Sequence, residues 1–243
     1  GLRPQRLKRL PYKEGVDRRL VTLNNPAKQE MVIRELAKAC KIAQLGNPSM
    51  FTKVEDLAHK SGAYVGSCTA MSQSLSTNAD LLPIGELYMI QDVKDPDNYR
   101  KVCEDGVASV NEFFKVLEQV CSMTMTLKFE KNAGKVGGME FDRLTFDIAA
   151  PMLPKKVEFS MKYAITADNQ MLMAGGEGDL SKLVDLSKTP GNAPPINCPK
   201  LDEGYRPVLQ LEYNWGELMK MAMKQSEQTM NSGQMKNSSE HLK

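Results

Sequence analysis

Three stretches between residues 121 and 165 alternate strictly between apolar and polar side chains, and this alternation constrains the fold more than any other feature of the chain. A period of two belongs to a β-strand with one buried and one solvated face, which is typical of antiparallel sheets. The connecting segments NAGKVGG and TADNQ favour hairpin turns. A fourth strand follows up to residue 176, so the sequence predicts a meander of about four strands. The alternating stretches are CSMTMTLKFE (121–130), EFDRLTFDI (140–148) and KVEFSMKYAI (156–165).

Apolar residues that recur every three or four positions predict helices elsewhere in the chain. The helix expected at 96–119 has Asp95 as its cap and Pro96 at its first position, where the missing N–H would have no partner in any case. Further helices are expected at about 26–45 and 179–187 and after Asn214, and further strands at about 62–75, 83–93 and 207–215.

These elements predict a single α+β domain: an antiparallel, mostly meander β-sheet with helices packed on one face. The domain is expected to span residues 21–228. Residues 1–20 are basic and weakly patterned, and they are interpreted as an N-terminal arm. Residues 229–243 are interpreted as a polar, frayed tail. Prolines and glycines between residues 189 and 206 predict a long surface loop.

The composition disfavours several classes of protein. Apolar residues make up 41% of the chain, and 32 basic against 30 acidic residues give a formal net charge of +2. Nucleic-acid binding needs a clustered excess of cations, and the solvated face of the predicted sheet lacks aromatic side chains on which bases stack. No nucleic-acid partner is therefore expected. No run approaches the roughly 20 apolar residues of a membrane span, so no transmembrane segment is expected in this chain.

The glycine-rich segment MLMAGGEGDLSKLVDL (171–186) has two interpretations. A dinucleotide loop needs G-x-G-x-x-G between a parallel strand and a helix. Here Ser181 occupies the third glycine position, and Glu177 and Asp179 would place carboxylates where an anion must bind. As a plain turn, the glycines let the chain leave the strand and Asp179 caps the next helix. The turn is favoured, and no cofactor is expected.

Few residues are suited to catalysis or metal binding. His59 and His241 are the only histidines, which excludes a histidine-rich metal site and leaves His59 alone for a Ser-His-Asp or Cys-His system. The acidic residues around Asp95 lack the glycine and distal glutamate of a calcium loop. The five cysteines contain no C-x-x-C and are interpreted as buried structural thiols, with one disulfide left open. An enzyme that uses carboxylates or a Ser/Lys pair is the least favoured function, and no metal ion is expected.

Methionine is unusually frequent, with 16 copies. Thioethers can bind Cu(I), but Met221 lies off the helical face that Met219 and Met223 share, so the three cannot act together as ligands. Core packing is the first interpretation of the strand methionines. The second is a methionine-lined cavity between sheet and helices that adapts to an apolar ligand, because these side chains are flexible. The residues assigned to this ligand site are Met123, Met125, Met161, Met171, Met173, Met219 and Met223.

Two segments carry a resemblance to a known group of proteins. ELYMIQDVKDPDNYRKV (86–102) and the strand–hairpin–helix passage 155–186 resemble uncharacterised bacterial cell-envelope proteins, in which a strand ends in a valine-lysine-aspartate-proline turn and a helix begins. The resemblance implies a periplasmic or cell-envelope location and carries over no functional residue. The favoured function is a non-catalytic binding or interaction module, and the alternative is a carrier of an apolar small molecule or lipid. The expected partner is accordingly an unidentified protein or an apolar small molecule.

Overall fold

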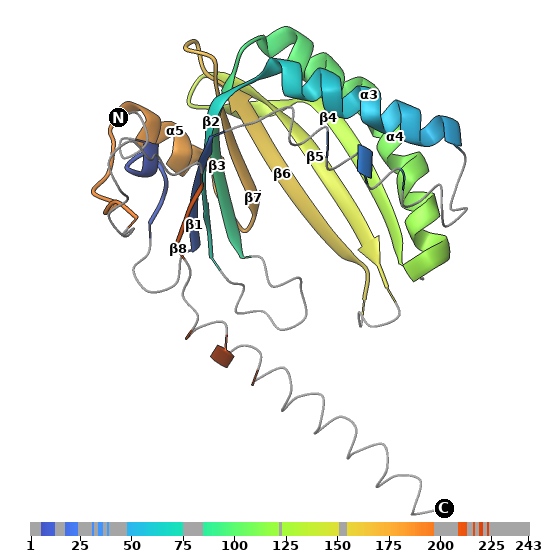
Figure 1. Ribbon diagram of the computed structural model, residues 1–243. Helices are drawn as coiled ribbons and strands as arrows, with labels where there is room; N and C mark the ends of the chain where they lie inside the picture. The colour runs from blue at the N-terminus through green and yellow to red at the C-terminus, as the bar shows by residue number, and fades with distance from the viewer. Residues whose placement is uncertain are drawn as a thin grey trace, which may run out of the picture.

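The described part of the chain forms an eight-stranded antiparallel sheet with three helices (Figure 1). The computed structural model describes residues 6–12, 18–23, 48–74, 85–121, 123–150, 155–196 and 209–212, and the single positions 31, 34, 35, 38, 216, 219, 220 and 223. The strands are β1 (Arg18–Leu23), β2 (Val65–Gln73), β3 (Glu86–Val93), β4 (Thr124–Val136), β5 (Met139–Ala149), β6 (Val157–Ile165), β7 (Gln170–Gly176) and β8 (Leu209–Glu212). The helices are α3 (Pro48–Tyr64), α4 (Pro96–Cys121) and α5 (Leu180–Lys188). The predicted α+β class and antiparallel sheet are confirmed.

The predicted meander is confirmed as the four consecutive strands β4 to β7. Leu127, Phe146 and Phe159 lie opposite one another on β4, β5 and β6, so the apolar residues of the alternating stretches share one face. Gly137 and Gly138 form the turn between β4 and β5 with φ angles of 55° and 87°. A two-residue hairpin of this kind requires positive φ at its central residues, which glycine adopts without strain.

The remaining strands extend the meander at its β7 edge. β3 pairs with β7 from Glu86↔Gly176 to Asp92↔Gln170, and β2, β1 and β8 follow in that order. Each of these strands runs antiparallel to its neighbours in the sheet.

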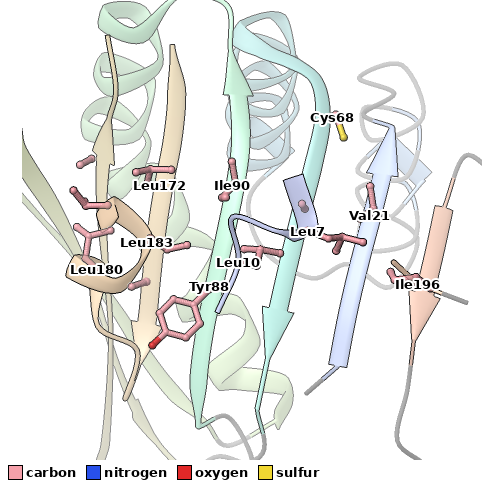
Figure 2. Close-up of a cluster of buried hydrophobic side chains, with 14 residues drawn as sticks. Leu7, Leu10, Val21, Cys68, Tyr88, Ile90, Leu172, Leu180, Leu183 and Ile196 are labelled. Carbon is pink, nitrogen blue, oxygen red and sulfur yellow. The ribbon is translucent and has the colours of Figure 1, made fainter. Parts of the chain in front are cut away.

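The helices are divided between the two faces of this sheet. On one face, Tyr99 of α4 packs on a cluster that includes Tyr163 and Met173. On the other face, α5 buries Leu180, Leu183 and Val184 against residues such as Leu172 (Figure 2). The expectation of one helical face therefore holds for α4 and for α3, which packs on α4, but α5 lies opposite them. The physical reason is that β7 is buried on both of its faces from Met171 to Ala174.

The N-terminal segment 6–12 belongs to the core of the domain, which corrects its interpretation as part of an arm at residues 1–20. Leu7 and Leu10 are each only 2% exposed and pack in the same cluster as α5 (Figure 2). The boundary expected at residue 21 also falls inside β1. The basic composition of this region hid its apolar residues, and the expected tail at 229–243 lies outside the described residues.

Two arginines fasten segment 6–12 to the sheet. Nη2 of Arg6 lies 2.6 Å from both carboxylate oxygens of Asp92, and its Nη1 donates to the Cys68 carbonyl at 3.1 Å. Nη1 of Arg9 donates to Oε1 of Gln170 at 2.8 Å. Charge-assisted hydrogen bonds of this kind are stronger than neutral ones, so the basic residues act here as structural anchors.

The first part of the chain departs from expectation at α3. This helix continues to Tyr64, so the strand expected at 62–75 begins at Val65, and His59 lies exposed within the helix. The helix expected at 26–45 lies outside the described residues, apart from four exposed helical positions. α3 packs on α4 closely, because a Cβ at Gly106 would lie 2.8 Å from a methyl carbon of Leu57.

A side chain from α4 caps the outer edge of β4, which is an edge strand of the sheet. Nδ2 of Asn111 donates to the Leu127 carbonyl at 2.9 Å, and the Leu127 N–H donates to Oδ1 of Asn111 at 2.7 Å. The carboxamide therefore occupies the position of a peptide group on an adjacent strand. Unpaired edge groups are a common site of unwanted strand association, and this contact satisfies two of them.

Replacing Asn111 with alanine should destabilise the protein. The Leu127 N–H and carbonyl would lose their partners in a partly buried place, which lowers the free energy of unfolding by about 1–3 kcal/mol. Urea unfolding followed by circular dichroism measures this change. The control is Lys115→Ala, an exposed position on the same helix, which should stay within about 0.5 kcal/mol of wild type. Equal stability of the two variants would contradict a capping role for Asn111.

Candidate functional site

The glycine-rich segment after β7 is a turn, as the sequence indicated. β7 runs antiparallel to both of its neighbours, β3 and β6, whereas a nucleotide loop follows a parallel strand. The N–H groups of Glu177 and Gly178 donate to the carbonyls of Gly85 and Gly175, both at 3.0 Å. They are used within the turn and do not point at a ligand. Gly176 has a φ of 62°, and a Cβ at this position would collide with the Gly85 carbonyl.

Asp179 caps α5, which confirms its predicted role. Its Oδ1 accepts a hydrogen bond from the Ser181 N–H at 2.9 Å, and its Oδ2 accepts one from the Ser181 hydroxyl at 2.7 Å. These hydrogen bonds hold the pKa of Asp179 below its usual range. The Asp179 N–H donates to the Tyr88 hydroxyl at 3.1 Å, which ties the start of α5 to β3 (Figure 2).

Three of the seven methionines assigned to a ligand site lie together. Met161 on β6 and Met171 and Met173 on β7 belong to one apolar cluster. Met125 lies on β4 opposite Ile148, and Met123 directly precedes that strand. Met219 and Met223 are 57% and 61% exposed. The seven residues are therefore not one continuous site, and the strand methionines of β6 and β7 form its centre.

Sequence patterns missed two further methionines that complete the group. Met71 on β2 lies opposite Met89 on β3, and Met89 lies opposite Met173 on β7. Leu20 on β1 extends this row beyond Met71. The alternation within each strand indicates which residues share a face, but the order of the strands was needed to place these residues side by side.

The row of residues on this face of β1, β2 and β3 is less buried than the residues on the opposite face of the same strands. Leu20, Met71 and Met89 are half-buried. Their sequence neighbours on the opposite face are all 0% exposed, namely Val21, Ala70 and Ile90. α4 packs chiefly on β4, at the far end of the sheet (Figure 1). An apolar surface therefore stays partly open on the central strands. We call it the methionine face, formed by Leu20, Met71, Leu87, Met89, Met161 and Met173.

A buried carboxylate that pairs with an arginine lies at one end of the methionine face. Tyr163 of β6 is opposite Met173, and Asp142 of β5 is opposite Tyr163, with both side chains 0% exposed. Nε of Arg100 lies 3.2 Å from Oδ2 of Asp142. The Asn132 N–H donates to the other carboxylate oxygen at 2.9 Å. The negative charge of Asp142 is thus compensated from α4 and from the backbone of β4.

Two phenols and a thiol adjoin this ion pair. The rings of Tyr99 and Tyr163 meet edge to face, with centroids 6.5 Å apart. Burial raises the pKa of both tyrosines far above the usual value, and burial also raises the pKa of the Cys103 thiol. All three groups are therefore protonated at neutral pH. A protonated thiol is a weak nucleophile, so Cys103 is suited to packing α4 on the sheet and not to covalent chemistry.

The other candidate groups give no further site in the described part of the chain. Cys68 and Cys103 are free thiols, and the side chains of Cys40, Cys121 and Cys198 lie outside the described residues. No three described His, Cys, Asp or Glu side chains are placed to hold a metal ion. Among the described residues, no helix combines the length and the apolar character that crossing a membrane requires.

Substitutions of Asp179 should separate its capping role from its charge. Asp179→Ala removes the cap and should lower the free energy of unfolding at pH 7 by about 1 kcal/mol, whereas Asp179→Asn should retain most of it. Because the pKa of Asp179 is lowered on folding, its charge stabilises the protein above the unfolded pKa of about 3.9. That contribution disappears as the pH falls through the lower, folded-state pKa.

Urea unfolding of wild type and Asp179→Asn between neutral and acidic pH measures this effect. The difference between them should shrink as the pH falls. A difference that stays constant with pH would show that the charge of Asp179 does not contribute.

Comparisons with models of protein families, with curated proteins and with solved structures find no match for this chain.

Proposed function

We propose that the protein is a non-catalytic binding module that holds an apolar ligand, such as a fatty-acyl chain, against the methionine face. The observation that carries the proposal is the contrast between the two faces of the central strands. Val21, Ala70 and Ile90 on one face are fully buried, whereas Leu20, Met71 and Met89 on the other are half-buried. Covering apolar surface contributes about 25 cal/mol per Å², so a contiguous open patch of this kind favours an apolar partner.

The shape of the row suits an extended chain. Leu20, Met71, Met89 and Met173 occupy four adjacent strands, and three strand spacings span about 14 Å. A linear acyl chain that crosses the strands would contact Leu20, Met71 and Met89 in turn and end beside Met173, which is only 7% exposed. Methionine adapts its side chain to an irregular or variable apolar surface, so chains of different length or unsaturation are accommodated.

The polarity of the surroundings also favours an uncharged, apolar ligand. Leu87 and Gln91 flank Met89 on the same face of β3, and neither side chain carries a charge. Beyond Tyr163, at one end of the row, the charge of Asp142 is neutralised by Arg100. A hydrocarbon that lies along the row leaves this ion pair undisturbed.

The non-catalytic character is part of the proposal and is supported by the state of Cys103. Its raised pKa keeps the thiol protonated, which opposes a role as nucleophile. The setting in the bacterial cell envelope is also proposed, on the resemblance of segments 86–102 and 155–186 to cell-envelope proteins.

Binding of 1-decanol, an uncharged linear alcohol, measured by isothermal titration calorimetry, tests the proposed function. Met71→Gln and Met89→Gln place an amide in the row, and each should weaken binding about tenfold because apolar contact is lost and the amide is desolvated. Met89→Leu preserves an apolar surface and should bind nearly as wild type does. The controls are Met219→Gln and Met223→Gln, at exposed positions, which should leave affinity unchanged.

The proposal is wrong if 1-decanol shows no saturable binding, or if the glutamine variants of the row and of the exposed positions behave alike. Native mass spectrometry of the freshly purified protein gives an independent readout. A bound mass of a few hundred daltons that is lost on denaturation would identify the natural ligand. Self-association that is abolished by Met89→Gln, without acyl binding, would assign the face to a protein partner instead.

A further inference from the structure

A polar pocket of about 270 Å³ lies on the side of the sheet opposite the methionine face. The end of segment 6–12, the adjoining ends of β2 and β3 and the first turn of α5 surround it. Ser72 and Tyr88 are opposite each other in the strand register and lie on the same face as Ala70 and Ile90. The side chains that matter for binding are Tyr12, Ser72, Ser74, Glu86, Tyr88 and Lys182.

Ser72 provides the observation that points to a ligand. Its side chain is 98% buried, since the residue is only 2% exposed, and it lines the pocket. Within the described part of the chain, no residue hydrogen-bonds to its hydroxyl. The hydroxyl is not one of the fully buried polar groups that lack a partner, so its open side is the pocket. A ligand group in the pocket would supply the missing hydrogen bond.

The hydroxyl of Tyr88 is a second group available to a ligand. It accepts a hydrogen bond from the Asp179 N–H, which fixes its position. Burial raises the pKa of Tyr88, so the hydroxyl keeps its proton. The proton can be donated into the pocket, beside the hydroxyl of Ser72.

Glu86 and Lys182 provide one acceptor and one donor at the rim. Nζ of Lys182 lies 3.0 Å from Oε1 of Glu86. The Ser74 hydroxyl accepts from the Glu86 N–H at 2.9 Å, which holds the start of β3 against the end of β2. These two charges cancel, so the lining has no net charge. An ionic ligand would have to separate the pair, whereas a neutral ligand can bind both partners without doing so.

Tyr12 contributes an aromatic wall. The guanidinium of Arg19 lies 4.5 Å from the centroid of its ring, and Arg19 also donates to the Pro194 carbonyl. This cation–π contact fixes the ring beside the pocket. An aromatic face next to several hydroxyl-binding groups suits a ligand with apolar C–H groups on one side and hydroxyls around its edge.

We propose that this pocket binds a neutral, polyhydroxylated small molecule of the size of a monosaccharide. Its hydroxyls donate to Glu86, accept from Lys182 and pair with Ser72 and Tyr88, while its C–H face packs on Tyr12. The volume of about 270 Å³ lies just below the roughly 300–1,000 Å³ of pockets for drug-sized ligands, which fits a single ring. This site is separate from the methionine face and does not depend on the function proposed for it.

Saturation-transfer NMR and titration with glucose, galactose, mannose, N-acetylglucosamine and myo-inositol test the assignment. The free amino acid alanine is titrated in the same way, as a small zwitterionic ligand for comparison. At least one of the polyols should bind saturably. Ser72→Ala and Glu86→Gln each remove one hydrogen bond to the ligand, and each should weaken binding about tenfold. Glu86 is at the rim of the pocket, so its variant tests the site even if Ser72→Ala affects folding.

Ser160→Ala is the matched control. Ser160 is likewise a serine of a central strand, and its hydroxyl is buried without a hydrogen-bond partner, but it lies on β6 outside the pocket. Its variant should bind the polyol with unchanged affinity, as should Met89→Gln. The assignment is overturned if none of the polyols binds, if Ser160→Ala weakens binding as much as Ser72→Ala does, or if alanine binds more tightly than every polyol.

Discussion

The backbone pairing of β3 with β7 is the interaction on which the rest of the structure depends. It joins the β4–β7 meander to the group β2, β1 and β8, which the chain forms from distant segments. The same pairing brings Met89 beside Met173 on one face and places Tyr88 within reach of Asp179 on the other. Both candidate binding surfaces therefore exist only once these two strands are in register, and a slip by one residue would exchange the two faces of β3.

Much of the fold could be predicted from local patterns, because those patterns report on one strand or one helix at a time. The meander followed from strict alternation, and the caps Asp95 and Asp179 followed from their positions before Pro96 and Leu180; the side chain of Asp95 accepts from the Asn98 N–H as expected. The position of α5 on the second face was missed. The signal was present in the uninterrupted apolar run from Met171 to Ala174, since a strand buried on both faces loses its alternation.

The candidate sites were less predictable because each depends on contacts between distant segments. Met161, Met171 and Met173 were identified from their strands, but Met71 and Met89 join them only through the strand order. The polar pocket had no sequence signature. Its parts come from residues as far apart as Tyr12 and Lys182, and none of its serines or tyrosines stands in a recognisable motif. Period and composition indicate which side chains are buried or exposed, but they do not indicate which of them meet.

The attachment of segment 6–12 has a consequence for the order in which the protein is completed during synthesis. Arg9 binds Gln170, which lies 161 residues later in the chain, and the Lys8 carbonyl accepts a hydrogen bond from the Gly191 N–H. At about 5–20 residues per second, roughly 10–30 s of translation separate the two ends of the first contact. During that interval the core around Leu7 and Leu10 lacks the residues that β7 and α5 contribute to it. Segment 6–12 is thus synthesised before the strands of the sheet but is among the last parts to reach its native position, and until then Tyr12 cannot form its wall of the pocket.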